Sequence, residues 1–297
     1  MWSDAARRAG RRVLPPVAER TWAAVARLAG RALRASARPA PWTGGGGVRV
    51  LVVAPHPDDE TIGAGGAICL HVAAGDDVTV AVVTDGAGSR AGGLDAAEMA
   101  RRRRGEVEAA AAALGVRRLE CLGLAEGGWA ESEAADALRP LLAEVEVVYA
   151  PSCVDYHPEH VAVARVVAGL VGPGQLVRVY ELGVPLTPVL VNCVADIGAV
   201  AERKARALAA FATQRESLEP VARLARYRAR LYGAEAVEVF WELPGAAYAR
   251  LIRAGDWRRR RTPFRGVHRH PFGDPLAALV GLRHRRALRG ASAAGRV

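Results

Sequence analysis

The sequence has 297 residues, of which 51% are hydrophobic and 24% are charged, and its formal net charge is +10. A chain of this length can form one large α/β domain with appendages, or two small domains. No apolar run approaches the roughly 20 residues that a membrane-spanning helix requires. No uninterrupted apolar segment follows the arginine pairs of residues 1–16, so we also expect no secretory signal.

Charge is distributed unevenly along the chain. Residues 1–47 carry a net charge of +7 and residues 245–297 one of +11, whereas residues 48–244 carry −8. We therefore expect a basic amphipathic arm with a glycine linker, then one acidic α/β domain, then a basic C-terminal extension without clear periodicity. Arginine supplies nearly all of the positive charge, because Lys204 is the only lysine.

The arm has arginines at helical spacing and an apolar face opposite them. Five of them fall on one helical face: Arg20, Arg27, Arg31, Arg34 and Arg38. Such a helix either lies on an anionic membrane surface or docks its apolar face on its own domain or on a second copy of the chain. Residues 39–47, with four successive glycines, predict a linker.

From residue 48 to residue 243, apolar strand-like runs alternate with helical segments. The predicted strands span 48–54, 77–84, 118–122, 145–150, 176–182, 189–194 and 236–243. The predicted helices span 61–74, 95–114, 131–143, 159–170, 196–211 and 219–232. This alternation predicts a Rossmann-like α/β fold, with a mostly parallel sheet and helices on both faces. Ligands of such sheets gather beyond the carboxyl ends of the strands.

Two motifs rich in acids and histidine follow predicted strands at that edge. His56-Pro57-Asp58-Asp59-Glu60 follows the strand 48–54, and His157-Pro158-Glu159-His160 follows the strand 145–150. Each motif alone could be structural, as acids at a helix N-terminus or as surface histidines. Together, at equivalent strand ends, they predict one metal site with a general base beside it.

A catalytic zinc ion usually takes three protein ligands and a water. The two motifs can supply His56, Asp59 and His160, which leaves Asp58 as a free carboxylate able to take a proton from the water. His157, one helical turn before His160, can donate a proton to a leaving amine or stabilise an oxyanion. The same donors also suit Fe(II), Mn(II) or Co(II).

The order of motifs resembles a known family. VVAPHPDDETIGAGG at 52–66 is followed by TDG, by Arg103-x-x-Glu106 before Ala-Leu-Gly-Val, and by His-Pro-Glu-His. Over about residues 48–243 this resembles the PIG-L/LmbE-like de-N-acetylases. The resemblance implies that His56, Asp59 and His160 bind zinc, that Asp58 is the general base and that His157 is the second catalytic group. It also implies hydrolysis of an N-acetyl group, mostly from N-acetylglucosamine on a carrier such as inositol, phosphatidylinositol or an antibiotic aglycone.

The sequence departs from the family at one position and leaves other roles open. The family usually has His-x-Asp-His, and Glu159 stands in place of that Asp, where we expect it to orient a neighbour or cap the helix. Tyr156 is either the carbonyl-polarising tyrosine of some members or a wall residue. Arg90 either meets a sugar hydroxyl or phosphate from a mobile lid or is a solvated loop arginine. We expect Arg103 to pair locally with Glu106.

These features predict a zinc-dependent hydrolase that removes the N-acetyl group from an N-acetylglucosamine-type conjugate, lipid- or phosphate-linked. The alternatives are a metal-dependent amidase acting on another acyl or thiol conjugate, and a non-enzymatic nucleic-acid or partner-binding protein. Nucleic acid is disfavoured because the basic flanks lack interleaved aromatic residues.

The expected partners are the amino-sugar conjugate and, through the basic flanks, an anionic membrane; the sequence leaves the oligomeric state open. The cysteines are scattered without CxxC spacing, which favours free thiols in a reducing compartment. These are Cys69, Cys121, Cys153 and Cys193. We therefore expect a cytoplasmic protein, held peripherally on the inner membrane face.

Overall fold

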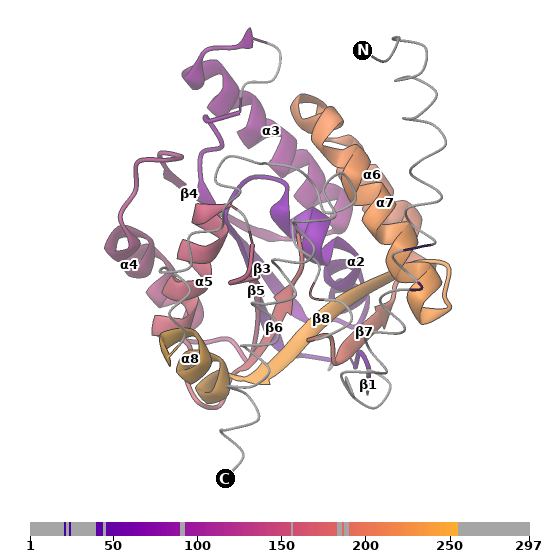
Figure 1. Cartoon of the computed structure of the whole chain (residues 1–297). Coiled ribbons are helices and arrows are strands. Elements are labelled where there is room, and N and C mark those ends of the chain that lie inside the picture. Colours follow the sequence, from indigo (N-terminus) through magenta and orange to yellow (C-terminus); the bar gives the residue numbers. More distant parts are fainter. Residues whose placement is uncertain are drawn as a thin grey trace, which may run out of the picture.

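A single eight-stranded sheet forms the centre of the protein (Figure 1). The computed structural model describes residues 21, 24, 40–43, 46–89, 93–155, 157–182, 186 and 190–254. The strands are β1 (Ala40–Pro41), β2 (Arg49–Ala54), β3 (Asp77–Thr84), β4 (Arg118–Leu124), β5 (Val147–Pro151), β6 (Leu176–Tyr180), β7 (Cys193–Asp196) and β8 (Val237–Pro244). Their order in the sheet is β1-β7-β8-β6-β5-β2-β3-β4.

Helices follow most strands, as the alternation predicts. The α-helices are α2 (Asp59–Ala73), α3 (Ala96–Leu114), α4 (Glu131–Leu142), α5 (Pro158–Leu170), α6 (Ala201–Ala209), α7 (Arg215–Tyr232) and α8 (Gly245–Ala254). Short 3₁₀ turns at Gly198–Val200 and Ala212–Gln214 precede α6 and α7. Gly115, in the left-handed conformation at φ 77°, ends α3 as expected from its sequence position. In the part of the chain that the structure describes, no helix is both long and apolar enough to cross a bilayer.

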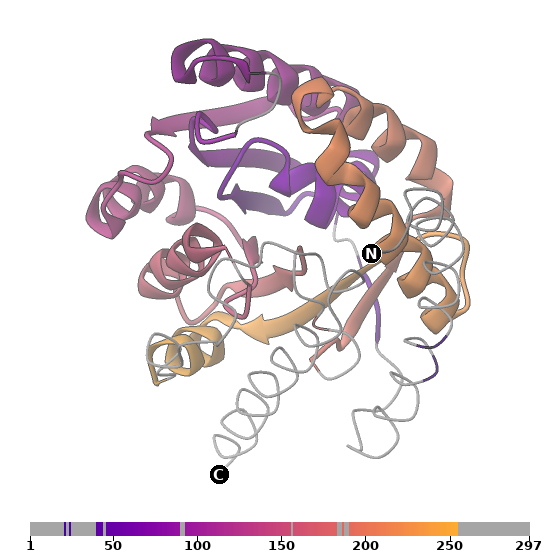
Figure 2. The ribbon, with the colours of Figure 1, turned by 45° about the horizontal axis from the view of Figure 1, so that its top comes forward.

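The sheet is parallel from β4 to β6, which confirms the predicted fold class. The exception is β8, which pairs antiparallel with both β6 and β7. Alternate β2 residues enter two separate cores: Leu51 and Val53 pack with α4, α5 and α8, whereas Val50 and Val52 pack with α2, α3 and α6. Figure 2 shows these two groups of helices on opposite sides of the sheet. Burial on both faces explains why the strands read as continuous apolar runs.

The strand order places the two motifs next to each other. The chain runs outward from β2 to β3 and β4, then crosses back to β5 on the other side of β2. Because β2 and β5 are adjacent and parallel, their carboxyl ends meet at the point where the strand order reverses. The motif that follows each strand therefore opens into the same crevice.

Helix α2 packs unusually close to the sheet through its glycines. A Cβ atom on Gly63 would collide with the ring of Tyr180, and one on Gly66 would lie 2.5 Å from Ile197. The buried carboxylate of Glu238 accepts hydrogen bonds from the backbone N–H groups of Gly66 (2.6 Å) and Ala67 (2.8 Å) in the middle of the helix. These glycines therefore serve close packing of the helix.

A buried polar network ties residue 42 to the amino ends of the strands. The hydroxyl of Tyr149 accepts hydrogen bonds from Trp42 Nε1 (2.9 Å) and Arg178 Nη1 (3.0 Å), and it lies 3.0 Å from Nε2 of His71. Nδ1 of His71 lies 2.6 Å from Oδ2 of Asp76. Because the tyrosine oxygen already accepts twice, its own proton goes to His71 Nε2, and the Nδ1–H of His71 goes to Asp76.

The two ends of the domain differ from the expected boundaries. Residues 39–47 were expected to be a linker, but Ala40–Pro41 pair with β7 and Trp42 joins the buried network. Residues 245–254 were expected in the aperiodic C-terminal extension, but they form α8, where the hydroxyl of Tyr248 bonds to Ala164 O of α5 (3.1 Å). Almost all of the basic arm, and residues 255–297, lie outside the described residues.

Candidate active site

The first motif forms a strained turn between β2 and α2. The sequence predicts a helix from residue 61, but α2 already begins at Asp59, which places Asp59 and Glu60 in its first turn. Asp58 precedes the helix with a φ of 138°, and it is the one non-glycine residue with positive φ in the part of the chain that the structure describes. Such a conformation costs about 1–3 kcal/mol and persists only where surrounding contacts enforce it.

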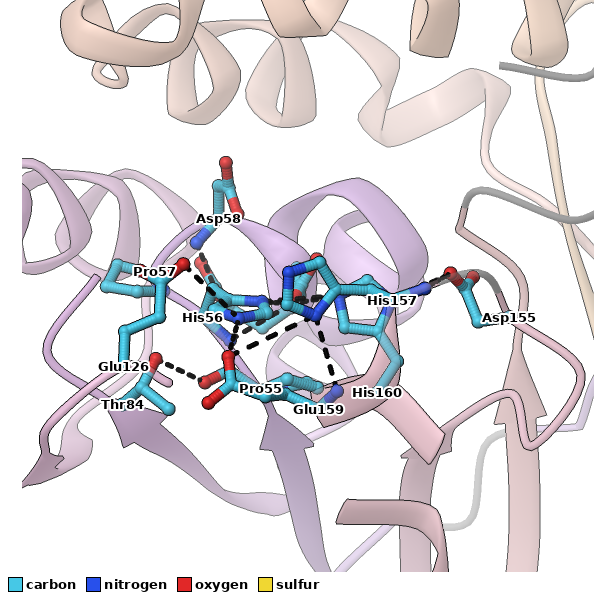
Figure 3. A network of polar contacts seen from close by, with 12 residues as sticks. Pro55, His56, Pro57, Asp58, Thr84, Glu126, Asp155, His157, Glu159 and His160 are labelled. Atoms are coloured by element: carbon cyan, nitrogen blue, oxygen red, sulfur yellow. Dashed lines mark hydrogen bonds and ion pairs between the residues drawn. The ribbon is translucent and has the colours of Figure 1, made fainter. Parts of the chain in front are cut away.

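Three side chains from the two motifs, those of His56, Asp59 and His160, converge on one point. Figure 3 shows the two histidines from close by. His56 Nδ1 lies 3.0 Å from Asp59 Oδ2, His160 Nε2 lies 3.3 Å from the same oxygen, and the two nitrogens are 3.2 Å apart. A tetrahedral ion with bonds of 2.0–2.1 Å has ligands about 3.3–3.4 Å apart. The three donor atoms therefore match one face of a tetrahedral zinc site, and we call them the inner triangle. The residues present fit a divalent metal ion.

Carboxylates lie behind the two histidines, beside their outer ring nitrogens. Glu159 Oε2 lies 2.8 Å from Nε2 of His56, and Asp155 Oδ1 lies 3.2 Å from Nδ1 of His160. A proton on each of these outer nitrogens leaves the inner nitrogen with a lone pair. Histidine ligands of metals are commonly oriented in this way. Asp155 was not predicted, although it lies only two residues before the second motif.

The electrostatics of the protein groups in the site favour positive charge. Burial alone would lower the pKa of His56, but hydrogen bonds with Asp59 and Glu159 raise it to about 9. Burial is likewise outweighed at His160, where Asp59 and Asp155 raise the pKa well above its ordinary value. Burial would raise the pKa of Asp59, but His160 and His56 hold it well below its usual range. The pocket thus attracts protons where a dication would sit.

Asp58 lies apart from the triangle and faces a buried arginine. Arg103 Nη2 is 3.2 Å from Asp58 Oδ2 and also donates to Pro57 O. Burial raises the pKa of Asp58 to about 7, against the opposing effect of Arg103. The expected local pair of Arg103 with Glu106 is therefore wrong. Glu106 instead accepts hydrogen bonds from the backbone N–H (2.8 Å) and hydroxyl (2.6 Å) of Thr213.

His157 caps α5, and its ring lies against the rings of His56 and His160. Its ring centroid is 4.5 Å from that of His56 and 4.8 Å from that of His160. Burial, together with the positive charge of those two rings, lowers the pKa of His157 to about 4. Its Nδ1 accepts the backbone N–H of Glu159 at 3.3 Å, so the proton of the neutral ring is on Nε2.

Part of the chain matches a known protein family. Residues 51–171 match the family described as PIG-L, GlcNAc-PI de-N-acetylase, and both motifs fall within the match. The matched segment covers less than half of the chain and shows a resemblance to the PIG-L family over those residues. De-N-acetylases of this type are metal-dependent hydrolases of amide bonds.

Solved structures share the fold of this chain. N,N'-diacetylchitobiose deacetylase from Pyrococcus horikoshii is 24% identical, with a TM-score of 0.58 over 67% of this chain and 85% of that one. The conserved protein TT1542 from Thermus thermophilus is 29% identical (TM-score 0.55; 66% and 95%). GalB, a 4-carboxy-2-hydroxymuconate hydratase from Pseudomonas putida, is 25% identical (TM-score 0.53; 66% and 96%). No curated protein gives a significant match.

A second group of donors borders the triangle of His56, Asp59 and His160 on its outer side. Glu126, on the loop after β4, has Oε1 4.0 Å from His56 Nε2, and it accepts the N–H of Gly88 at 2.9 Å. With His157 and Glu159 it could also hold an ion. The outer His56 nitrogen, however, already has a carboxylate partner in Glu159, whereas the three atoms of the inner triangle face one another. The inner triangle is therefore the better metal site.

The remaining sequence expectations have different outcomes. Arg90 and Tyr156 lie outside the described residues, so their roles stay predictions. All four cysteines are free thiols, as expected. Cys153 is buried in the apolar core beside α5, and burial raises its pKa to about 12. It is therefore not part of the inner donor triangle.

Proposed function

We propose that this protein is a zinc-dependent de-N-acetylase, with His56, Asp59 and His160 as metal ligands, Asp58 as general base and His157 as the second catalytic group. The observation that carries the proposal is the inner triangle, whose three donor atoms lie 3.0, 3.2 and 3.3 Å apart beside a separate carboxylate. A bound divalent ion would supply Lewis acidity, polarising the acetamide carbonyl and acidifying a water.

Asp58 is suited to accept the proton of the attacking water. Its pKa of about 7 is close to neutral pH, where a base transfers protons most effectively. Arg103 and the strained backbone hold its carboxylate away from the ligand triangle. Asp58 therefore stays available for proton transfer when His56, Asp59 and His160 are occupied.

His157 is suited to stabilise the oxyanion. A ring with a pKa of about 4 is neutral at physiological pH, so it is a poor proton donor but a good hydrogen-bond donor. Its Nε2–H is free to point at the reacting carbonyl because Nδ1 is occupied by the Glu159 N–H. Protonation of the leaving amine then falls to Asp58, which holds the proton taken from water.

We propose an N-acetylglucosamine-type conjugate as the substrate, lipid- or phosphate-linked. Support comes from the family match and from the fold shared with a chitobiose deacetylase. The hydratase with the same fold indicates that the scaffold also supports other chemistry. An amidase with a different acyl specificity, or a protein that only binds, are the other outcomes of the test.

The test combines metal analysis with acetate-release assays across free, phosphate-linked and lipid-linked N-acetylglucosamine. We expect one bound divalent ion per chain and stoichiometric release of acetate and free amine. A chain that binds no divalent metal would refute the proposal. Turnover of another acyl group without acetate would replace it by the amidase alternative.

We also propose peripheral attachment to anionic membranes through the basic flanks, an inference from sequence charge alone. Changing the five arm arginines to glutamine in the full chain should reduce co-sedimentation with vesicles that contain phosphatidylglycerol. A matched chain with five exposed arginines changed elsewhere controls for net charge. Equal binding by the two variants would exclude the arm as the anchor.

A further inference from the structure

Glu159 makes contacts in two directions from one carboxylate. Oε2 faces His56 Nε2 at 2.8 Å, whereas Oε1 accepts hydrogen bonds from Gly127 N at 2.9 Å and from Trp129 Nε1 at 2.5 Å. The residue is 8% exposed and lies in the first turn of α5. One buried side chain thus joins a proposed metal ligand to the loop between β4 and α4.

Both contacts require an ionised carboxylate with two acceptor oxygens. Gly127 and Trp129 offer only N–H donors to Oε1, and Oε2 must accept the Nε2–H of His56 if Nδ1 is to keep its lone pair for a metal. A neutral amide of the same shape cannot satisfy both sides. Its NH₂ group would face either the two loop donors or His56, and in the second case it would favour the tautomer with hydrogen on Nδ1.

The length of the side chain matters as well. An aspartate at position 159 is shorter by one C–C bond of about 1.5 Å. From the same backbone it could not reach His56 and the loop together. The glutamate, where the resembled family usually has aspartate, therefore spans a distance that an aspartate from the same backbone would not.

We propose that Glu159 is a positioning residue, which sets the tautomer of His56 for metal binding and holds Trp129 against the site through the same carboxylate. The inference rests on the proposed function for the identity of the ligands. Trp129 is partly buried and packs on the core beside α4, so the loop presents an aromatic wall next to the metal position. Metal affinity and the geometry of this wall are then coupled.

The experiment measures Zn(II) affinity by chelator competition and the visible spectrum of the Co(II)-loaded protein, for wild type, Glu159→Gln and Glu159→Asp. We expect both variants to bind zinc about 10–100-fold more weakly, the range typical for loss of such a partner, and to show an altered Co(II) spectrum. Glu133→Gln is the matched control, because this exposed glutamate caps the adjacent helix α4, where glutamine serves equally well.

A second variant tests the coupling from the other side. Trp129→Phe keeps an aromatic ring but removes the N–H that Oε1 accepts, and we expect its effect on zinc affinity to be non-additive with that of Glu159→Gln. Circular dichroism melting checks that each variant folds. Wild-type affinity and spectrum in both Glu159 variants would overturn the positioning role. Failure of the wild type to bind any metal would instead refute the proposed function.

Discussion

The protein contains two buried assemblies of histidine and carboxylate, one at each edge of the sheet. At the amino edge, His71 lies between Asp76 and Tyr149, and each ring nitrogen has a partner of complementary type. At the carboxyl edge, His56 and His160 have outer carboxylate partners, but their inner nitrogens face each other at 3.2 Å. In the first assembly every ring nitrogen is satisfied by a hydrogen bond. In the second, the inner ring nitrogens are arranged to bind a cation.

The pKa shifts express the same difference. Burial dominates at His71 and lowers its pKa, so the ring is neutral and serves only to connect its neighbours. At His56 burial is outweighed by Asp59 and Glu159, and the pKa is raised to about 9. Burial of a histidine beside a carboxylate is therefore not in itself a sign of a site. The informative feature is a pair of ring nitrogens that face each other and share one carboxylate oxygen.

The largest expected effect comes from removing a donor of the assembly at the carboxyl edge, which contains His56 and His160. His56→Ala should lose metal binding, and turnover should fall to background, because two donors hold a dication far less tightly than three. Added zinc should raise the melting temperature of the wild type through binding to the folded state, but not that of the variant. His71→Ala is the comparison: it should lower stability and keep zinc binding. Zinc stabilisation of His56→Ala would remove His56 from the ligand set.

A large effect on catalysis without loss of metal is expected at the base. Asp58→Asn keeps the shape of the turn and removes proton acceptance, so kcat should fall by about 10²–10⁴. Inductively coupled plasma analysis should still find one metal ion per chain. If Asp58→Asn retained full kcat, the assignment of the base would be wrong.

An intermediate effect, on stability only, is expected at the assembly at the amino edge, around His71 and Tyr149. Tyr149→Phe leaves Trp42 Nε1, Arg178 Nη1 and His71 Nε2 without their shared partner, which should cost about 2–4 kcal/mol of unfolding free energy. Tyr248→Phe, which loses a single hydrogen bond to Ala164 O, should cost about 1 kcal/mol. Denaturant unfolding measures both. Equal losses in the two variants would contradict the network.

The smallest effect is a difference in the sign of pH dependence. The lowered pKa of His71 means that the unfolded chain gains a proton near pH 6.5 that the folded protein does not, so this group removes stability as pH falls below that value. The raised pKa of His56 acts oppositely in chelator-treated protein, where its stabilisation is lost as pH rises from about 6.5 through about 9. His71→Gln should flatten only the acid limb of a plot of unfolding free energy against pH. A flattened alkaline limb would reverse this assignment.

Much of the sheet could be predicted because its strands are apolar on both faces and its helices carry recognisable ends. The antiparallel direction of β8 could not be read, since a buried strand has the same pattern in either direction. Ala40–Pro41 and α8 were missed because their partners, Cys193 and Ala164, are distant in sequence. The four glycines at 44–47 suggested a linker, so the start of the domain was predicted at residue 48, after the first strand.

Within the site, the residues that belong to a local sequence motif could be predicted. The residues that reach the site only through tertiary contacts could not. His56, Asp59 and His160 meet because two motifs follow adjacent strands. Arg103 reaches Asp58 from a helix 45 positions away, and its sequence context equally suited a local pair with Glu106. The role of Glu159 depends on Trp129 and Gly127, which no pattern connects to it.

The backbone conformation of Asp58 has a practical consequence. At a φ of 138° glycine would sit without strain, so Asp58→Gly should release the energy held in that turn while deleting the proposed base. Selection of heat-resistant variants from a random library would then enrich proteins that no longer turn over substrate. Engineering of this chain for thermal stability should therefore measure catalytic activity together with melting temperature, or leave residue 58 unchanged.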